Sequence, residues 1–201
     1  MNILVLAPMK EECEYFKLAI IKFLKENELK HRYFIKNIGV GKASAAAETV
    51  LALNNVSVTI PYDLIFLIGY AAATKAFPKG SFVFPDKTMY HDTPHSNAEL
   101  FQDLTKSYEL QGSDKNTTIL TGDQFVTKEL AEKLITQYGN RLLFDMEAAA
   151  VCQICQDTEI PVLVMKMISD NPEEDNLESF EDFVKTHSDF SAFVYFTETL
   201  G

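Results

Sequence analysis

The chain has 201 residues, of which 47% are hydrophobic, so it can fill a sizeable core as one large domain spanning residues 1–201, with no need of disulfide bonds. Its formal net charge is −11, and its arginines are Arg32 and Arg141. A surface this acidic repels phosphate backbones and anionic lipids, which makes nucleic acids and membranes poor partners.

Apolar, β-rich runs alternate with helical patterns along the chain, which predicts a mostly parallel sheet flanked by helices. Strands are predicted at residues 2–7, 31–38, 63–69, 81–85, 116–121, 141–144 and 161–168. Helices are predicted at residues 9–27, 42–54, 97–108, 127–138 and 146–157, with a last one from about 178 to 200. The fold class is therefore α/β.

The helix predicted at residues 9–27 carries three glutamates near its start. At 100° per residue, Glu12 lies at the edge of the apolar stripe, whereas Glu11 and Glu14 fall on the opposite face. If one of the three points into a site at the end of the first strand, it is Glu12. Otherwise all three belong to a solvated helix start.

Two later helices carry local signals. The helix at residues 127–138 opens on Thr127, a residue type that caps helix N-termini. The last helix has an aromatic stripe that we expect to be buried, made of Phe180, Phe183, Phe190, Phe193 and Phe196.

The loop Gly39-Val-Gly41-Lys42 matches two phosphate-binding motifs only weakly. A Walker A loop needs a glycine where Lys36 stands and a serine or threonine where Ala43 stands. A Rossmann fingerprint needs a glycine at Ser44 and an acid at the end of the next strand, whereas Asp63 begins that strand. The glycines most simply let the backbone turn closely before a helix.

The cysteines and histidines predict neither a metal site nor a cofactor. Cys152 and Cys155 lie three residues apart in a predicted helix without a second ligand pair, which favours core packing. His91 and His95 flank a turn with no further clustered ligand. Three cysteines form no disulfide framework, and no window reaches the ~18 apolar residues of a membrane span, so we expect a cytoplasmic protein.

The strand predicted at residues 161–168 leads directly into Ser169 and Asp170. Ligands of open α/β sheets bind beyond the carboxyl ends of the strands, which makes Asp170 a candidate site residue. Alternation places Lys166, Ile168 and Asp170 on one side of a regular strand, and a lysine inside so apolar a run needs an anionic partner. Alternatively, Asp170 caps a turn and Lys166 reaches solvent from an edge strand.

Asp145 and Glu147 flank Met146 at the start of a predicted helix. The helix dipole favours negative charge there, so the two carboxylates have an ordinary structural explanation as an N-cap and a first-turn acid. They are also placed to contribute to a site, but the local pattern taken alone favours the structural role.

The order of these segments is more specific than any one of them. Met9-Lys-Glu-Glu12, Gly39-Val-Gly-Lys42, Leu67-Ile-Gly-Tyr-Ala-Ala-Ala73, Tyr90-His-Asp92, Thr121-Gly-Asp-Gln-Phe-Val126, Asp145-Met-Glu-Ala148, Ile168-Ser-Asp-Asn171 and Ser179-Phe-Glu-Asp-Phe183 follow one another. This series resembles the purine nucleoside phosphorylase/uridine phosphorylase superfamily over nearly the whole chain. It is most similar to the 5′-methylthioadenosine/S-adenosylhomocysteine nucleosidases.

The resemblance implies a three-layer sandwich with a mixed, mostly parallel twisted sheet, and a homodimer. It implies that Asp170 is the acid at the purine N7 and that Glu12 activates the attacking water, as paired carboxylates do in glycoside hydrolysis. The further substrate-binding residues it implies are Phe125 and Val126 at the base, Met146 and Glu147 at the ribose, Ser169 supporting Asp170, and Phe180 closing over the ligand.

The chain departs from the family pattern at four places. Tyr70 stands in a loop of small residues and is bulky enough to remodel or occlude the pocket beside the ribose. Lys166 replaces an arginine, which keeps the charge but loses the bidentate fork. Asp145 replaces a glutamate. The stretch after Asp92, which in the family reaches the 5′-substituent pocket of the neighbouring subunit, is shortened.

Four functions are compatible with these residues. The first is hydrolysis of a purine nucleoside of the 5′-substituted adenosine type. The second is phosphorolysis on the same fold, which usually needs arginine clamps. Arg32 and Arg141 lie outside the motif series, which favours water as the nucleophile, although Lys166 keeps this alternative open. The third is a purine nucleoside sensor without turnover. The fourth is dinucleotide binding, which the position of Asp63 opposes.

Overall fold

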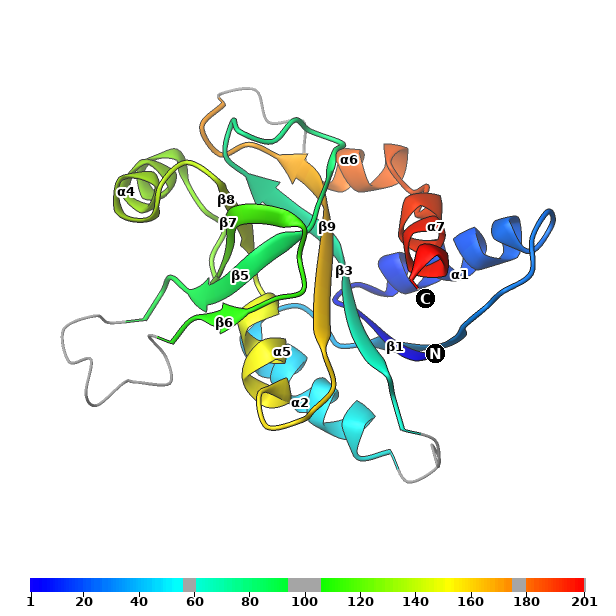
Figure 1. The fold of residues 1–201 in the computed structure, drawn as a ribbon. Coiled ribbons are helices and arrows are strands. Elements are labelled where there is room, and N and C mark those ends of the chain that lie inside the picture. Colours follow the sequence, from blue (N-terminus) through cyan, green and yellow to red (C-terminus); the bar gives the residue numbers. More distant parts are fainter. Residues whose placement is uncertain (56–60, 94–105, 175–179, 201) are drawn as a thin grey trace.

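The computed structural model describes residues 1–55, 61–93, 106–174 and 180–200, and within them helices cover both faces of one twisted sheet (Figure 1). The strands are β1 (Asn2–Ala7), β2 (Arg32–Asn37), β3 (Leu64–Ala73), β4 (Phe82–Val83), β5 (Pro85–Tyr90), β6 (Tyr108–Glu109), β7 (Asp114–Thr121), β8 (Leu142–Asp145) and β9 (Val162–Asp170). The helices are α1 (Lys10–Phe23), α2 (Lys42–Leu53), α4 (Lys128–Tyr138), α5 (Ala148–Cys155), α6 (Phe180–Thr186) and α7 (Ser191–Thr199).

The sheet is mixed and mostly parallel, as predicted. Its main path runs β2-β1-β3-β8-β7-β5-β6, with β9 and β4 paired off this path. Strand β3 lies at the centre of the sheet. It pairs in parallel with β1 and β9, and its last two residues pair with β8 in the antiparallel sense. The remaining antiparallel pairs are the short ones that β4 and β6 make.

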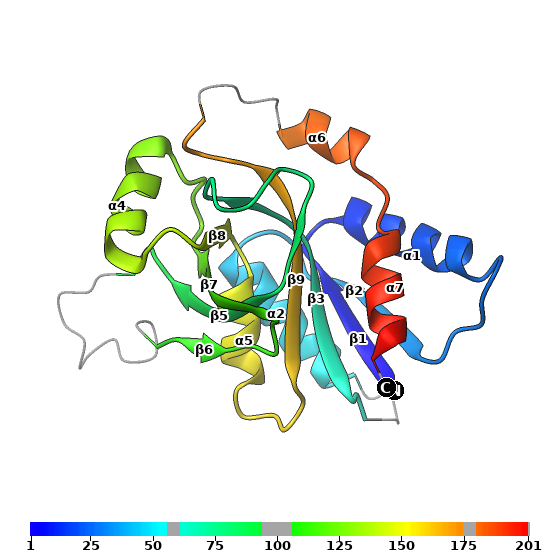
Figure 2. The ribbon, with the colours of Figure 1, turned by 45° about the horizontal axis from the view of Figure 1, so that its top comes forward.

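The two faces of β3 explain the three layers. Its residues Ile65 and Leu67 pack in one apolar cluster with residues of α2 and α5. Phe66 and Ile68, which point to the opposite face, pack with residues of α1, α6 and α7. A strand buried on both faces needs a continuous apolar run, and that is how its sequence reads. Figure 2 shows the two helical layers on either side of β3 and β9.

The prediction of one helix from about residue 178 to 200 is wrong. The described part contains two helices, α6 and α7, and the chain bends between them at residues 187–190. Asp189 explains the new start, because its side chain accepts hydrogen bonds from the backbone N–H and the hydroxyl of Ser191. The aromatic stripe expected to be buried is so in part: Phe183, Phe190 and Phe193 are fully buried, whereas Phe180 and Phe196 are partly buried.

The helix predicted at residues 97–108 lies mostly outside the described residues, and its last residue is not helical. Tyr108 belongs to β6, which pairs with β5. The strand predicted at 81–85 is also wrong in extent, because β4 covers two of its residues and β5 begins at Pro85 and continues to Tyr90. Both strands are short or half polar, so they carry little periodic signal.

Several local predictions are confirmed. Thr127 caps α4 by accepting a hydrogen bond from the backbone N–H of Leu130. Cys152 and Cys155 are buried and free, as core packing requires. A separate finding concerns the helices of the described residues, none of which has the length and hydrophobicity that a membrane span requires.

Candidate active site

A cavity of about 620 Å³ lies where the ends of β1, β3, β8 and β9 meet the loop after β7. Its size suits a small organic ligand. Its wall includes nine of the ten residues that the sequence singles out, namely Glu12, Tyr70, Phe125, Val126, Met146, Glu147, Ser169, Asp170 and Phe180. The tenth, Lys166, is fully buried in the strand below and does not line the cavity.

Glu12 is held by two backbone donors. Its Oε2 accepts a hydrogen bond from the N–H of Met9 at 2.7 Å, and its Oε1 accepts one from the N–H of Tyr70 at 3.0 Å. The side chain is buried, and this loss of water raises its pKa from an ordinary value of 4.5 to about 7, although nearby Lys166 opposes the rise. A carboxyl with a pKa near neutrality can act as a base at physiological pH.

Gly69 makes this position of Glu12 possible. Its φ is +140°, and a Cβ atom placed on it would lie 2.5 Å from Oε1 of Glu12. Any other residue would therefore push the carboxylate away. The glycine of the Leu67–Ala73 motif is thus explained by the close approach of the first helix to β3.

Glu147 comes from the turn between β8 and α5, and its Oε1 accepts a hydrogen bond from the N–H of Gly41 at 2.9 Å. Burial, and then the neighbouring charge of Asp145, raise its pKa to about 7. Gly41, at φ +93°, turns the backbone so that this N–H can point to the carboxylate. The Gly-Val-Gly loop therefore binds a carboxylate of the same chain, a pairing that no local pattern in the sequence indicates.

Lys166 has the anionic partner that its burial demands. Its Nζ forms an ion pair with Oδ2 of Asp145 at 3.1 Å, and both side chains are fully buried. Burial lowers the pKa of this lysine, but Asp145, Glu147 and Glu12 outweigh burial and raise it overall. The ammonium is thus a fixed positive charge beneath three carboxylates.

Asp145 is a site residue whose structural role the sequence left open. It lines the cavity, and its Oδ1 accepts a hydrogen bond from the hydroxyl of Thr121 at 2.7 Å. Its Oδ2 also accepts one from the N–H of Ala148 at the start of α5. Helix α5 begins at Ala148 with Glu147 at the N-cap position, so the N-cap expected at Asp145 and the first-turn position expected for Glu147 are wrong. The carboxylate of Asp145 nevertheless accepts the first N–H of α5 and neutralises Lys166.

Asp170 and Ser169 both reach the cavity because β9 is irregular at its end. Ile168 pairs with Ala71, but Asp170 pairs with Ala72, so the register shifts by one residue. The expected alternation therefore fails after Ile168, as it does at a β-bulge. Ser169 donates a hydrogen bond to Oδ1 of Asp170 at 2.5 Å, which agrees with its expected supporting position.

Apolar side chains supply much of the remaining wall. Phe125 projects from the loop before α4 and is 80% exposed, a high fraction for a phenylalanine. Phe180 begins α6 on the same cavity, and Met146 and Val126 complete the apolar surface. A flat aromatic ligand could stack on such a surface.

Tyr70 lines the cavity but does not close it. Its hydroxyl donates a hydrogen bond to the carbonyl of His187 at 2.9 Å, between α6 and α7. Its ring makes edge contacts with Phe180, Phe183 and Phe190. The bulk of this residue is therefore accommodated among the aromatic side chains of the C-terminal helices, and the cavity stays open.

The comparisons with known proteins agree with this geometry. Residues 6–194 match the phosphorylase superfamily. The chain belongs to this superfamily. It is 26% identical over 186 residues to the 5′-methylthioadenosine/S-adenosylhomocysteine nucleosidase of Buchnera aphidicola subsp. Schizaphis graminum, an alignment that covers 82% of this chain and 77% of the relative.

Solved structures share the fold at lower identity. The nucleosidase of the same name from Neisseria meningitidis, in complex with methylthio-immucillin-A, has a TM-score of 0.78 at 20% identity and covers 99% of both chains. Futalosine hydrolase of Helicobacter pylori has a TM-score of 0.76 at 19% identity, covering 98% of this chain and 97% of its own. The three-layer nucleoside phosphorylase-like architecture is therefore shown.

Proposed function

We propose that the chain is a nucleosidase that hydrolyses the N-glycosidic bond of a 5′-substituted adenosine to adenine and the free ribose moiety. Asp170 is the acid that protonates or hydrogen-bonds the purine N7, and Glu12 deprotonates the attacking water. Glu147 holds the ribose hydroxyls. The relatives named nucleosidases support the reaction class, and the structural relative bound to a nucleoside analogue supports the ligand class.

The observation that carries the proposal is the meeting of three carboxylates from distant segments on one cavity. Glu12 comes from α1, Glu147 from the turn after β8, and Asp170 from the end of β9. Cleavage of a glycosidic bond passes through a cationic sugar, which such carboxylates stabilise. The pKa values of about 7 for Glu12 and Glu147 allow proton exchange at neutral pH.

The charges of the wall favour water over phosphate as the nucleophile. Among the described residues of the wall, Lys128 is the one base, against the acids Glu12, Asp145, Glu147, Asp170 and Glu174. An anionic phosphate would be repelled by this surface. Arg141 is bound elsewhere, with its guanidinium on Thr117 and over the ring of Phe77.

The reaction is tested by incubating the protein with 5′-methylthioadenosine, S-adenosylhomocysteine, futalosine, adenosine and inosine, with and without phosphate. We expect free base to appear in phosphate-free buffer at an unchanged rate. A strict requirement for phosphate would instead establish the phosphorylase alternative. Tight binding of a nucleoside without any turnover would establish a sensor.

Replacing the acid gives the sharpest variant. Asp170→Asn keeps the size of the side chain and can no longer supply the proton, so we expect base release to fall by about 10²–10⁴-fold with an unchanged circular dichroism spectrum. Asp157→Asn, an exposed carboxylate after α5, is the matched control and should be fully active. Near-normal turnover by Asp170→Asn would refute the assignment.

We also propose, from the resemblance, that the protein works as a cytoplasmic homodimer. The assembly is tested by sedimentation, in which a mass of one chain at micromolar concentration would contradict it. The compartment is tested by fractionating the cells that make the protein. Recovery outside the cytoplasm would contradict that part.

A further inference from the structure

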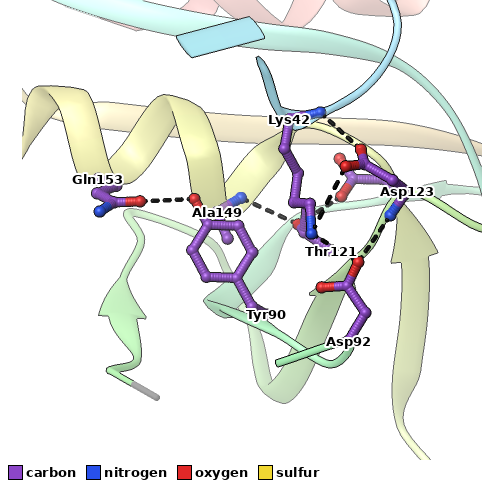
Figure 3. A network of polar contacts seen from close by, with 8 residues as sticks. Lys42, Tyr90, Asp92, Thr121, Asp123, Ala149 and Gln153 are labelled. Carbon is purple, nitrogen blue, oxygen red and sulfur yellow. Dashed lines mark hydrogen bonds and ion pairs between the residues drawn. The ribbon is translucent and has the colours of Figure 1, made fainter. Parts of the chain in front are cut away.

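Three of the sequence motifs meet outside the cavity, at the side chain of Lys42 (Figure 3). The Nζ of Lys42 lies 2.6 Å from Oδ2 of Asp92 and 3.6 Å from Oδ2 of Asp123. The backbone N–H of Lys42 donates to Oδ1 of Asp123 at 2.8 Å. The backbone N–H of Asp123 donates to Oδ2 of Asp92 at 3.0 Å. These contacts form a closed network between three distant segments.

The network is better held than an ordinary surface ion pair. The side chains of Lys42 and Asp92 are 26% and 22% exposed, and that of Asp123 is half exposed. The carboxylates of Asp92 and Asp123 each accept a backbone hydrogen bond as well. The ammonium lies over the ring of Tyr90, whose hydroxyl donates to Gln153 of α5. An exposed ion pair alone contributes little to stability. A charge network whose carboxylates also accept backbone hydrogen bonds holds its side chains in a defined geometry.

Two of the three segments continue into the cavity wall. Gly41, next to Lys42, donates the hydrogen bond that holds Glu147. Asp123 is followed by Gln124, Phe125 and Val126, all of which line the cavity. Lys42, Asp92 and Asp123 themselves do not line it. Their contacts therefore act on the wall through the backbone.

We propose that Lys42, Asp92 and Asp123 are positioning residues that clamp the start of α2 to the loop after β7. The clamp fixes the N–H of Gly41 on Glu147 and holds Phe125 at the mouth of the cavity. Its effect on turnover rests on the proposed function, but the clamp itself does not. Because Asp170 and Glu12 belong to other segments, loss of the clamp weakens binding more than it slows the chemical step.

The test uses Lys42→Met, which removes the charge and keeps the backbone N–H. We expect amide hydrogen exchange of residues 122–127 to accelerate by about tenfold. We expect KM for 5′-methylthioadenosine to rise about tenfold, with kcat changed less than about threefold. Lys42→Arg should restore both values. Asp92→Asn, which also breaks the ion pair, should behave in the same way if Lys42→Met folds poorly.

The matched control is Lys36→Met. It breaks the ion pair between Lys36 on β2 and Glu48 on α2, the helix that Lys42 begins. This pair does not touch the cavity wall. The proposal fails if residues 122–127 exchange in Lys42→Met and Asp92→Asn as slowly as in the control. If the wild type turns over no nucleoside, the proposed function fails, and hydrogen exchange still decides the clamp.

Discussion

At the scale of single residues, the site concentrates buried charge. Glu12, Asp145 and Glu147 surround Lys166, so ionisation of all four leaves net negative charge in a place with little water. The protein tolerates this because each carboxylate accepts hydrogen bonds from backbone N–H groups or from Thr121. The pKa values of about 7 for Glu12 and Glu147 are the measurable result.

The activity should depend on the ionisation of Glu12. The proposed base works only when ionised, and the pKa of Glu12 is about 7, so kcat/KM for 5′-methylthioadenosine should rise as the pH increases from about 6 to 8. A pH profile of initial rates measures this. A rate that is flat over this range would contradict the assignment of Glu12 as the base.

The same pKa has a consequence for stability. The folded pKa of Glu12 is raised from 4.5 to about 7, so its contribution is fully present below about pH 4.5 and is lost as the pH rises through 7. The free energy of unfolding that Glu12 contributes, and that is lost over this pH range, is on the order of 3 kcal/mol. Urea unfolding of Glu12→Gln at several pH values should therefore show a shallower fall of stability with pH than the wild type. Equal slopes would contradict the raised pKa.

Gly69 should be indispensable for the position of Glu12. Gly69→Ala places a Cβ atom 2.5 Å from Oε1 of Glu12, so the carboxylate of Glu12 must move. We expect this misplacement of the carboxylate to lower kcat/KM by about 100-fold. Gly139→Ala is the matched control, because Gly139 also has a positive φ but a Cβ there has nothing within 4 Å. Equal activity of the two variants would show that the close approach is unimportant.

At the scale of elements, periodicity predicted the long, well-patterned segments. The strands around Phe66 and Val164 were evident from continuous apolar runs. The pattern of α1 placed Glu12 only at the edge of the apolar stripe, and the structure shows that its side chain is buried. Periodicity could not predict the break between α6 and α7, because the aromatic stripe continues across it. Asp189, whose carboxylate accepts the N–H of Ser191, is the local signal for that break, and one such side chain is a weak signal against a strong apolar stripe.

Tyr70 should contribute to stability through the junction of α6 and α7. Tyr70→Phe removes the hydrogen bond to the carbonyl of His187 and keeps the ring, so unfolding should become easier by about 1 kcal/mol. Tyr195→Phe, with a side chain about half exposed on α7, is the control and should be neutral. Chemical denaturation measures both variants. An unchanged stability of Tyr70→Phe would mean that this contact does not hold the helices.

At the scale of the whole molecule, the site could be predicted only from the order of its motifs. Each of Glu12, Glu147 and Asp170 has an ordinary structural explanation when its own segment is considered alone. The resemblance gathered them, and the structure places all three on one wall. The order of the motifs could not predict the hydrogen bond from the backbone N–H of Gly41 to Glu147 or the network around Lys42. Such tertiary contacts produce no periodic pattern in the sequence.

The central claim is that these carboxylates converge on one sugar–base bond. A crystal structure with a bound, non-hydrolysable purine nucleoside analogue tests it most directly. We predict that the carboxyl group of Asp170 lies about 3 Å from N7 of the purine, with Glu12 and Glu147 at the sugar. A base bound away from Asp170, or a sugar that neither glutamate contacts, would contradict the account.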